Sequence, residues 1–230
     1  MKKTNKVKAL TFAVATMGAL TSLPSHAATT LNGGFNFEFT PTNSSHVMNI
    51  RADSWYNLTM GYLGWTHHSN WGYMRLRRGQ PVTITVDATD IDGFHPGVTV
   101  WYRRQGRRFA PIEYVNAHSY SQSQDVMVQN ATLDDDPVNP VNLGRIHMEF
   151  ITNAFDRDGM GDILGETYDQ SAINKVLDGV PGKVSLTFTP PKNGFYQFVV
   201  GGINPDEDID TSKAVSQRYP VSVEVSFPGR

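Results

Sequence analysis

The chain has 230 residues, with 20 Lys and Arg against 22 Asp and Glu and no cysteine. This near balance of charge argues against nucleic acid or an anionic membrane surface as a partner, because both attract proteins through an excess of positive charge. The lack of cysteine excludes disulfide bonds and the closed thiolate zinc sites of zinc fingers.

Residues 1–27 have the composition of a secretory signal peptide. Four lysines precede the apolar run Ala9–Leu20, and Ser25-His26-Ala27 is a small-residue cleavage signature. Cleavage after Ala27 would leave 203 residues with 16 basic and 22 acidic side chains. No later stretch is long and apolar enough to cross a bilayer. We therefore expect an exported protein that is periplasmic, secreted or attached to the outer-membrane surface, with residues 28–230 forming one domain.

Most of the remaining sequence consists of short runs separated by Gly, Pro, Asn and Asp. Alternation of apolar and polar residues with period two predicts half-buried strands. Five runs alternate in this way or are continuously apolar: Gln80–Asp87, Gly97–Tyr102, Lys183–Thr189, Phe195–Val200 and Tyr219–Phe227. Only Met160–Leu177 has loosely helical spacing, and it contains two glycines. The sequence predicts an all-β fold, an antiparallel β-sandwich with long loops and one short helical insert, with Trp101 in its core.

The segment from Gly64 to Trp71 is a candidate metal site. It holds two of the four tryptophans and two of the seven histidines of the chain. In an extended segment, residues i and i+2 point to the same side, so Trp65 and His67 would share one face and His68 would point away. If the segment is a loop, His68 could be the ligand instead of His67. Imidazole is the commonest side-chain ligand for transition metals.

A second imidazole would have to come from another part of the chain. His118 lies between Tyr114 and Tyr120, an aromatic setting like that of His67. The alternative is that both His67 and His118 are ordinary half-buried or surface histidines.

Acidic residues form a second candidate metal site. Asp156, Asp158 and Asp162 lie around two glycines, an arrangement that lets a loop wrap oxygen ligands around Ca²⁺. The segment is not an EF-hand, because Met160 and Thr167 occupy two of the ligand positions of that motif. We predict a calcium site here, and the alternative is a solvated acidic turn.

With its export signal, its lack of cysteine, its β-rich body and Trp65-Thr66-His67 followed by a later histidine, the chain resembles the copper-binding surface proteins of methane-oxidising bacteria, the MopE/CorA family. In that family a tryptophan two residues before a ligand histidine is oxidised to kynurenine, and copper is held by that residue, the adjacent histidine and a distant one. The resemblance implies that Trp65 is the kynurenine precursor, His67 the adjacent ligand and His118 the distant one, with His147 as the reserve.

This resemblance predicts an exported copper(I)-binding protein for copper capture or storage outside the cell, and not an enzyme. Two imidazoles and one weak amine suit Cu(I) and leave Zn²⁺ and Ca²⁺ undersupplied with ligands. One alternative is a surface module that binds carbohydrate or protein, in which Trp55, Trp65 and Trp71 form an exposed platform and calcium braces the loops. Another is a copper-dependent oxidase with an open coordination position.

Overall fold

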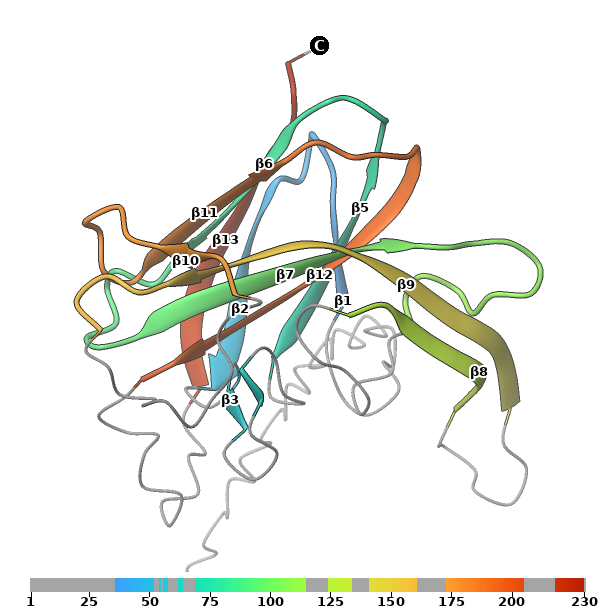
Figure 1. Cartoon of the computed structure of the whole chain (residues 1–230), viewed down its shortest axis with the longest axis horizontal. Coiled ribbons are helices and arrows are strands. Elements are labelled where there is room, and N and C mark those ends of the chain that lie inside the picture. The colour runs from blue at the N-terminus through green and yellow to red at the C-terminus, as the bar shows by residue number, and fades with distance from the viewer. Residues whose placement is uncertain are drawn as a thin grey trace, which may run out of the picture.

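The computed structural model describes residues 36–51, 54, 56–57, 62–63, 69–114, 124–133, 141–160, 173–204 and 218–229. Within these residues the chain forms strands, bridges and turns and no helix. Two large sheets pack against each other, which confirms the predicted all-β sandwich (Figure 1). Among the residues described, no helix is long and apolar enough to span a membrane.

The larger sheet has seven strands in the order β1-β5-β12-β7-β9-β10, with β8 also paired to β9. Most pairs are antiparallel, but β1 runs parallel to β5 and β10 runs parallel to the end of β9. The sheet is therefore mixed at its edges rather than purely antiparallel. Its strands are β1 (Asn36–Phe39), β5 (Asn70–Leu76), β7 (His95–Arg103), β8 (Val126–Leu133), β9 (Val141–Asp156), β10 (Lys175–Val176) and β12 (Gly194–Ile203).

The smaller sheet has four antiparallel strands in the order β11-β6-β13-β2. Buried and exposed residues alternate along β13, as expected for a sheet with one face against the core and one face toward solvent. A short pair, β3 (Tyr56–Asn57) and β4 (Tyr62–Leu63), lies outside both sheets. The strands of the smaller sheet are β2 (Ser45–Arg51), β6 (Val82–Asp87), β11 (Lys183–Phe188) and β13 (Arg218–Ser226).

All five sequence runs that predicted strands are strands: they correspond to β6, β7, β11, β12 and β13. Long-range pairing joins them, since β6 lies between β11 and β13, and β12 lies between β5 and β7. The sequence pattern therefore located these strands correctly, and tertiary pairing determined their neighbours.

Two hydrophobic clusters cover opposite faces of the larger sheet. The first lies between the two sheets and includes Phe198 and Val200 of β12. The second includes the intervening Val199 together with Trp71 and Trp101. Because neighbouring residues of β12 enter different clusters, this strand is buried on both faces, which explains its continuous apolar sequence. Trp101 is fully buried, as predicted.

The predicted helical insert is wrong in the part that the structure describes. Ile173 is buried, and Lys175–Val176 form β10 instead of a helical turn. The backbone N–H of Phe155 donates to the carbonyl of Asn174, and the N–H of Arg157 donates to the carbonyl of Val176. These hydrogen bonds to the end of β9 fix an extended backbone, so tertiary pairing overrides the weak helical spacing. Residues 161–172 of the predicted insert lie outside the described residues.

Strand β9 is much longer than its neighbours, with 16 residues. Its second half pairs with β7, whereas its first half pairs with β8. β8 and the first half of β9 therefore form a two-stranded ribbon that extends beyond the sandwich, at the right of Figure 1.

Candidate metal centre

The predicted copper ligands Trp65, His67 and His118 lie outside the described residues, but the chain on either side of them is described. Ser69, two positions after His67, is buried, and its hydroxyl donates to the carbonyl of Ser54 over 2.5 Å. The backbone N–H of Gly202 donates to the hydroxyl of Ser54 over 2.8 Å. This chain of contacts fixes the start of β5 against the end of β12.

Trp71, two residues after Ser69, belongs to the second hydrophobic cluster. Its ring centroid lies 5.6 Å from that of Trp101, with the two planes tilted by 31°. Trp71 is only 1% exposed. The prediction that Trp55, Trp65 and Trp71 form an exposed platform is therefore wrong for Trp71. The second cluster covers the face of the larger sheet on which Trp71 lies, and the sequence alone did not indicate that this face is buried. Trp55 lies outside the described residues.

The residues that flank His118 reach the same cluster. Tyr114 packs against it, and the guanidinium of Arg103 donates to the carbonyls of Ala110 and Tyr114. On the other side, the indole Nε1–H of Trp101 donates to the carbonyl of Gln124 over 3.1 Å. The chain is thus anchored to the Trp71 and Trp101 cluster both before and after His118.

The reserve ligand His147 lies in the first half of β9, between Ile146 and Met148. Both neighbours are fully buried in the cluster that contains Trp71 and Trp101. Because side chains alternate along a strand, His147 points to the opposite face. Its cross-strand partner on β8 is Met127.

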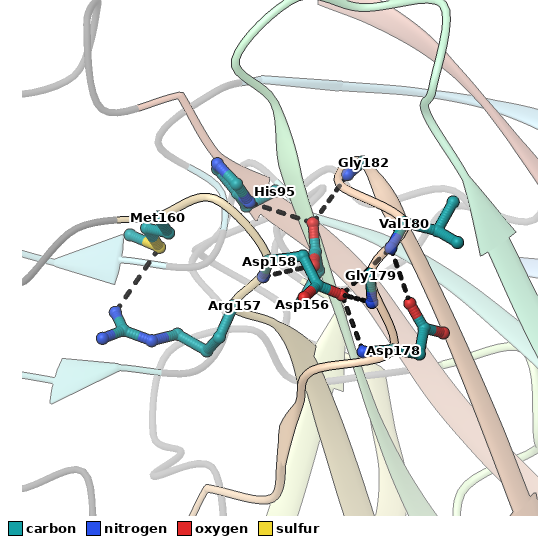
Figure 2. Close-up of polar contacts among 9 residues, drawn as sticks. All are labelled: His95, Asp156, Arg157, Asp158, Met160, Asp178, Gly179, Val180 and Gly182. Carbon is teal, nitrogen blue, oxygen red and sulfur yellow. Dashed lines mark hydrogen bonds and ion pairs between the residues drawn. The ribbon is translucent and has the colours of Figure 1, made fainter.

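The described residues also contain a buried histidine–carboxylate pair that sequence reasoning did not find. The Nδ1–H of His95, at the start of β7, donates to Oδ2 of Asp156 at the end of β9 over 2.9 Å (Figure 2). Asp156 is 0% exposed and His95 is 6% exposed. The two residues are 61 positions apart, so only the pairing of their strands brings them together.

Backbone N–H groups supply the remaining donors to Asp156. Gly182 donates to Oδ2 over 2.7 Å and Asp158 donates to Oδ1 over 2.9 Å. Gly182 has a φ of +83°, which favours glycine, and an added Cβ would lie 3.1 Å from the Cα of Thr89. The carboxylate of Asp156 therefore joins three parts of the chain in a space that excludes a larger residue at position 182.

Asp158 has a comparable role on the neighbouring turn. Its Oδ2 accepts hydrogen bonds from the backbone N–H groups of Asp178, Gly179 and Val180, at 2.8, 2.8 and 3.2 Å (Figure 2). Burial alone would raise the pKa of Asp158, but these hydrogen bonds outweigh it and lower the pKa below its ordinary value.

These contacts bear on the predicted calcium site. Three of the four carboxylate oxygens of Asp156 and Asp158 accept hydrogen bonds from the protein itself. Asp162, the third predicted ligand, lies outside the described residues. Within the described part of the chain, no group of three or more His, Cys, Asp or Glu side chains could hold a metal ion.

Comparison with known families bears directly on the copper prediction. Residues 26–210 match the family described as copper(I)-binding protein CorA-like. The chain belongs to this family. The matched range includes Trp65, His67 and His118, and CorA-like proteins are copper-binding proteins.

Two solved structures resemble this CorA-like chain. One is CorA of Methylomicrobium album BG8, described as a surface-associated copper-binding protein important in copper acquisition. The two sequences are 50% identical over 85% of this chain and 98% of CorA, and the structures superpose with a TM-score of 0.71. The other is MopE, a secreted protein of Methylococcus capsulatus in which an oxidised tryptophan facilitates copper binding. The two sequences are 20% identical over 83% of this chain and 87% of MopE, and the structures superpose with a TM-score of 0.58. The second likeness shows a shared fold. A search of curated proteins found no match.

Proposed function

We propose that this protein captures copper(I) outside the cell for acquisition by the cell that exports it, with His67, His118 and an oxidised Trp65 as ligands. The family match carries this proposal, because it spans all three residues in one continuous range. Support for the physiological role comes from CorA, which is half identical in sequence and is described as surface-associated and important in copper acquisition.

The chemistry of the three side chains supports copper(I). An intact indole nitrogen acts only as a hydrogen-bond donor, so Trp65 could not ligate a metal as tryptophan. Oxidation to kynurenine opens the five-membered ring and releases an aryl amine with a usable lone pair. Two imidazoles and this weak amine make a nitrogen site of low coordination number, which suits Cu(I). The description of MopE, in which an oxidised tryptophan facilitates copper binding, supports the same assignment.

The anchored flanks support His118 as the partner of His67. Trp71 lies four residues after His67, and Tyr114 lies four residues before His118. Four residues of fully extended chain reach at most about 14 Å. Trp71 belongs to the second hydrophobic cluster and Tyr114 packs against the same cluster, so each histidine is only four residues from a residue that is anchored there. His147 is the weaker choice, since it points to the other face of the sheet.

The export prediction completes the proposed role. We propose cleavage after Ala27 and attachment at the outer-membrane surface or release into the medium, in agreement with the descriptions of CorA and MopE. The role is binding and does not require a catalytic step. Amino-terminal sequencing of the protein recovered outside the cytoplasm tests this point: a chain that begins at Met1 in the cell fraction contradicts it.

Copper retention after dialysis against a moderate chelator tests the ligand set. His67→Ala and His118→Ala should each lose copper almost as completely as the double variant, because a single imidazole and a weak amine hold the ion poorly. His68→Ala should retain copper. His46→Ala is a matched control and should also retain copper, because His46 lies on β2 of the smaller sheet. Full copper retention by His118→Ala would remove His118 from the site, and full retention by His67→Ala would refute the proposed centre.

Peptide mass spectrometry of the natural, copper-grown protein tests the modification separately. Trp65 and Trp71 lie in the same tryptic peptide, residues 52–75, so fragment-ion masses are needed to locate the change. These masses should show one carbon replaced by one oxygen at Trp65, whereas Trp71 in this peptide and Trp101 in its own peptide should have unmodified tryptophan masses. Both controls are buried in the second cluster, so neither indole is accessible for oxidation. An unmodified Trp65 peptide would exclude kynurenine as a ligand.

A further inference from the structure

Met127 and His147 face each other across the β8–β9 ribbon. They are directly opposed in the antiparallel register, and their neighbours Val126 and Met148 form the next pair. Directly opposed residues place their side chains on the same face of a sheet, with Cβ atoms about 4.5–5.5 Å apart. The thioether and the imidazole are therefore within reach of a single ion.

Met127 does not contribute to the core. It is 59% exposed, whereas Val126 beside it is 4% exposed and packs in the second cluster. The opposite strand shows the same alternation, with Ile146 and Met148 buried and His147 only partly buried. Packing therefore explains the inward residues of the ribbon and leaves Met127 and His147 free of that role.

We propose that Met127 and His147 form a second copper(I) site, separate from the proposed centre at His67 and His118. A thioether is a soft ligand that selects Cu(I), and imidazole also binds copper. The thioether of Met127 accepts a weak hydrogen bond from Gln129, whose Nε2 donates to the sulfur over 3.1 Å. The unbranched methionine side chain can rotate to replace this contact with a metal bond.

The surrounding charges permit a monovalent cation. Alternation along β9 places Arg145 and Glu149 on the same face as the pair, and Asp125 directly precedes β8. Arg104 and Lys192 both form ion pairs with Glu149, and together with Arg145 and the exposed Asp125 these side chains carry three positive and two negative charges. The net charge of plus one opposes a cation only weakly, because salt screens charges at an exposed surface. The ribbon is exposed, and two ligands bind more weakly than three. The site is therefore suited to accepting copper(I) from outside and releasing it.

Titration with Ag(I), a redox-inert substitute for Cu(I), tests the site in the full exported protein labelled with ¹³C-methyl methionine. The experiment uses the His67→Ala/His118→Ala background, so that its result does not depend on the proposed centre. The Met127 methyl resonance, assigned with Met127→Leu, should shift on the first additions of Ag(I). The methyl resonances of buried Met48, Met74 and Met148 should not shift, and they also report that each variant is folded.

His147→Gln decides whether the imidazole is a ligand. In this variant the affinity measured at the Met127 methyl should fall by more than roughly a hundredfold, the upper end of what the loss of an outer partner costs. His46→Gln, a partly buried histidine on β2, is the matched control and should leave the affinity unchanged. An unshifted Met127 methyl, or equal affinity in His147→Gln, would overturn the second site. If His147→Gln in the otherwise native protein loses tight copper retention, His147 belongs to the proposed centre at His67 and His118. That result would also overturn the second site.

Discussion

The imidazole of His95 donates to the carboxylate of Asp156, and this contact joins the first residue of β7 to the last residue of β9. Asp156 also accepts the N–H of Gly182, in the turn that leads into β11 of the smaller sheet. One buried carboxylate thus connects both layers of the sandwich at the same end. A buried charge is tolerated there because each neighbouring group is a donor.

Asp156→Asn should lower the free energy of unfolding by about 3 kcal/mol. An amide has one acceptor oxygen and one NH₂ group, so at least one of the three donors around Asp156 would face another donor. Urea unfolding measures the loss. Asp178→Asn is the control, because Asp178 is exposed and its Oδ1 accepts the local N–H of Val180, which an amide oxygen also accepts. The control should change stability by no more than about 0.5 kcal/mol, and equal effects in the two variants would contradict the buried role of Asp156.

Asp158 should make stability depend on acid pH. Its pKa is lower in the folded protein because three backbone N–H groups favour the charged form over the opposing effect of burial. A group with a lowered folded pKa contributes stability that is fully present above its unfolded pKa and is lost as the pH falls through the folded pKa. The loss should begin below about pH 4.

The urea midpoint measured from neutral to acid pH tests this prediction. Asp158→Asn should be less stable at neutral pH and should show a shallower decline below about pH 4 than the native protein. Lys192→Gln, which removes a surface partner of Glu149, is a comparison with a smaller expected effect. Parallel acid declines for the native protein and Asp158→Asn would show that Asp158 does not control this range.

Calcium binding should be tested through Asp162 rather than through Asp156 or Asp158. Those two carboxylates hold backbone N–H groups, so replacing them should destabilise the protein whether or not calcium is present. If the predicted site exists, the native protein should melt roughly 5–10 °C higher with calcium at about a hundred times its dissociation constant than with a chelator. Asp162→Asn should remove that increment without changing the melting temperature in chelator. Equal melting of the native protein in both conditions would eliminate the site.

Strands that alternate between a buried and an exposed face were predictable from the sequence. In β6, Val82, Ile84 and Val86 are buried and their neighbours are not, and this period-two signal identifies both the strand and its inward face. In β5, by contrast, Trp71 enters the second cluster while Met74 enters the first. A strand buried on both faces loses the alternation, and for that reason Trp71 could be mistaken for an exposed platform residue.

Of the candidate sites, only those with a local sequence motif could be predicted from the sequence. The local motif Trp65-Thr66-His67 led to a family that the family match confirms, because residues two positions apart can be recognised in one sequence. The pair of His95 and Asp156 has no local signature, since its geometry depends on which strands are neighbours in the larger sheet. The opposition of Met127 and His147 likewise depends on a register that has two irregularities, and a slip of one residue would place the two side chains on opposite faces.

Trp101→Phe should reduce both stability and copper affinity. Trp101 is fully buried against Trp71, and its Nε1–H holds the carbonyl of Gln124, six residues after His118. Loss of the larger ring and of this donor should lower the free energy of unfolding by about 2 kcal/mol. Because Gln124 anchors the chain that carries His118, copper(I) affinity should fall as well, by an amount measurable in competition with a chelator.

Phe198→Leu separates the two effects. Phe198 is fully buried in the first cluster, between the sheets, so its replacement should cost a comparable free energy of unfolding without loosening the anchor at Gln124. Measured where both variants are fully folded, copper(I) affinity should fall for Trp101→Phe and stay at the native value for Phe198→Leu. Equal affinities in the two variants would mean that the Trp71 and Trp101 cluster stabilises the fold without positioning His118, and the argument that its anchored flanks bring His118 to His67 would fail.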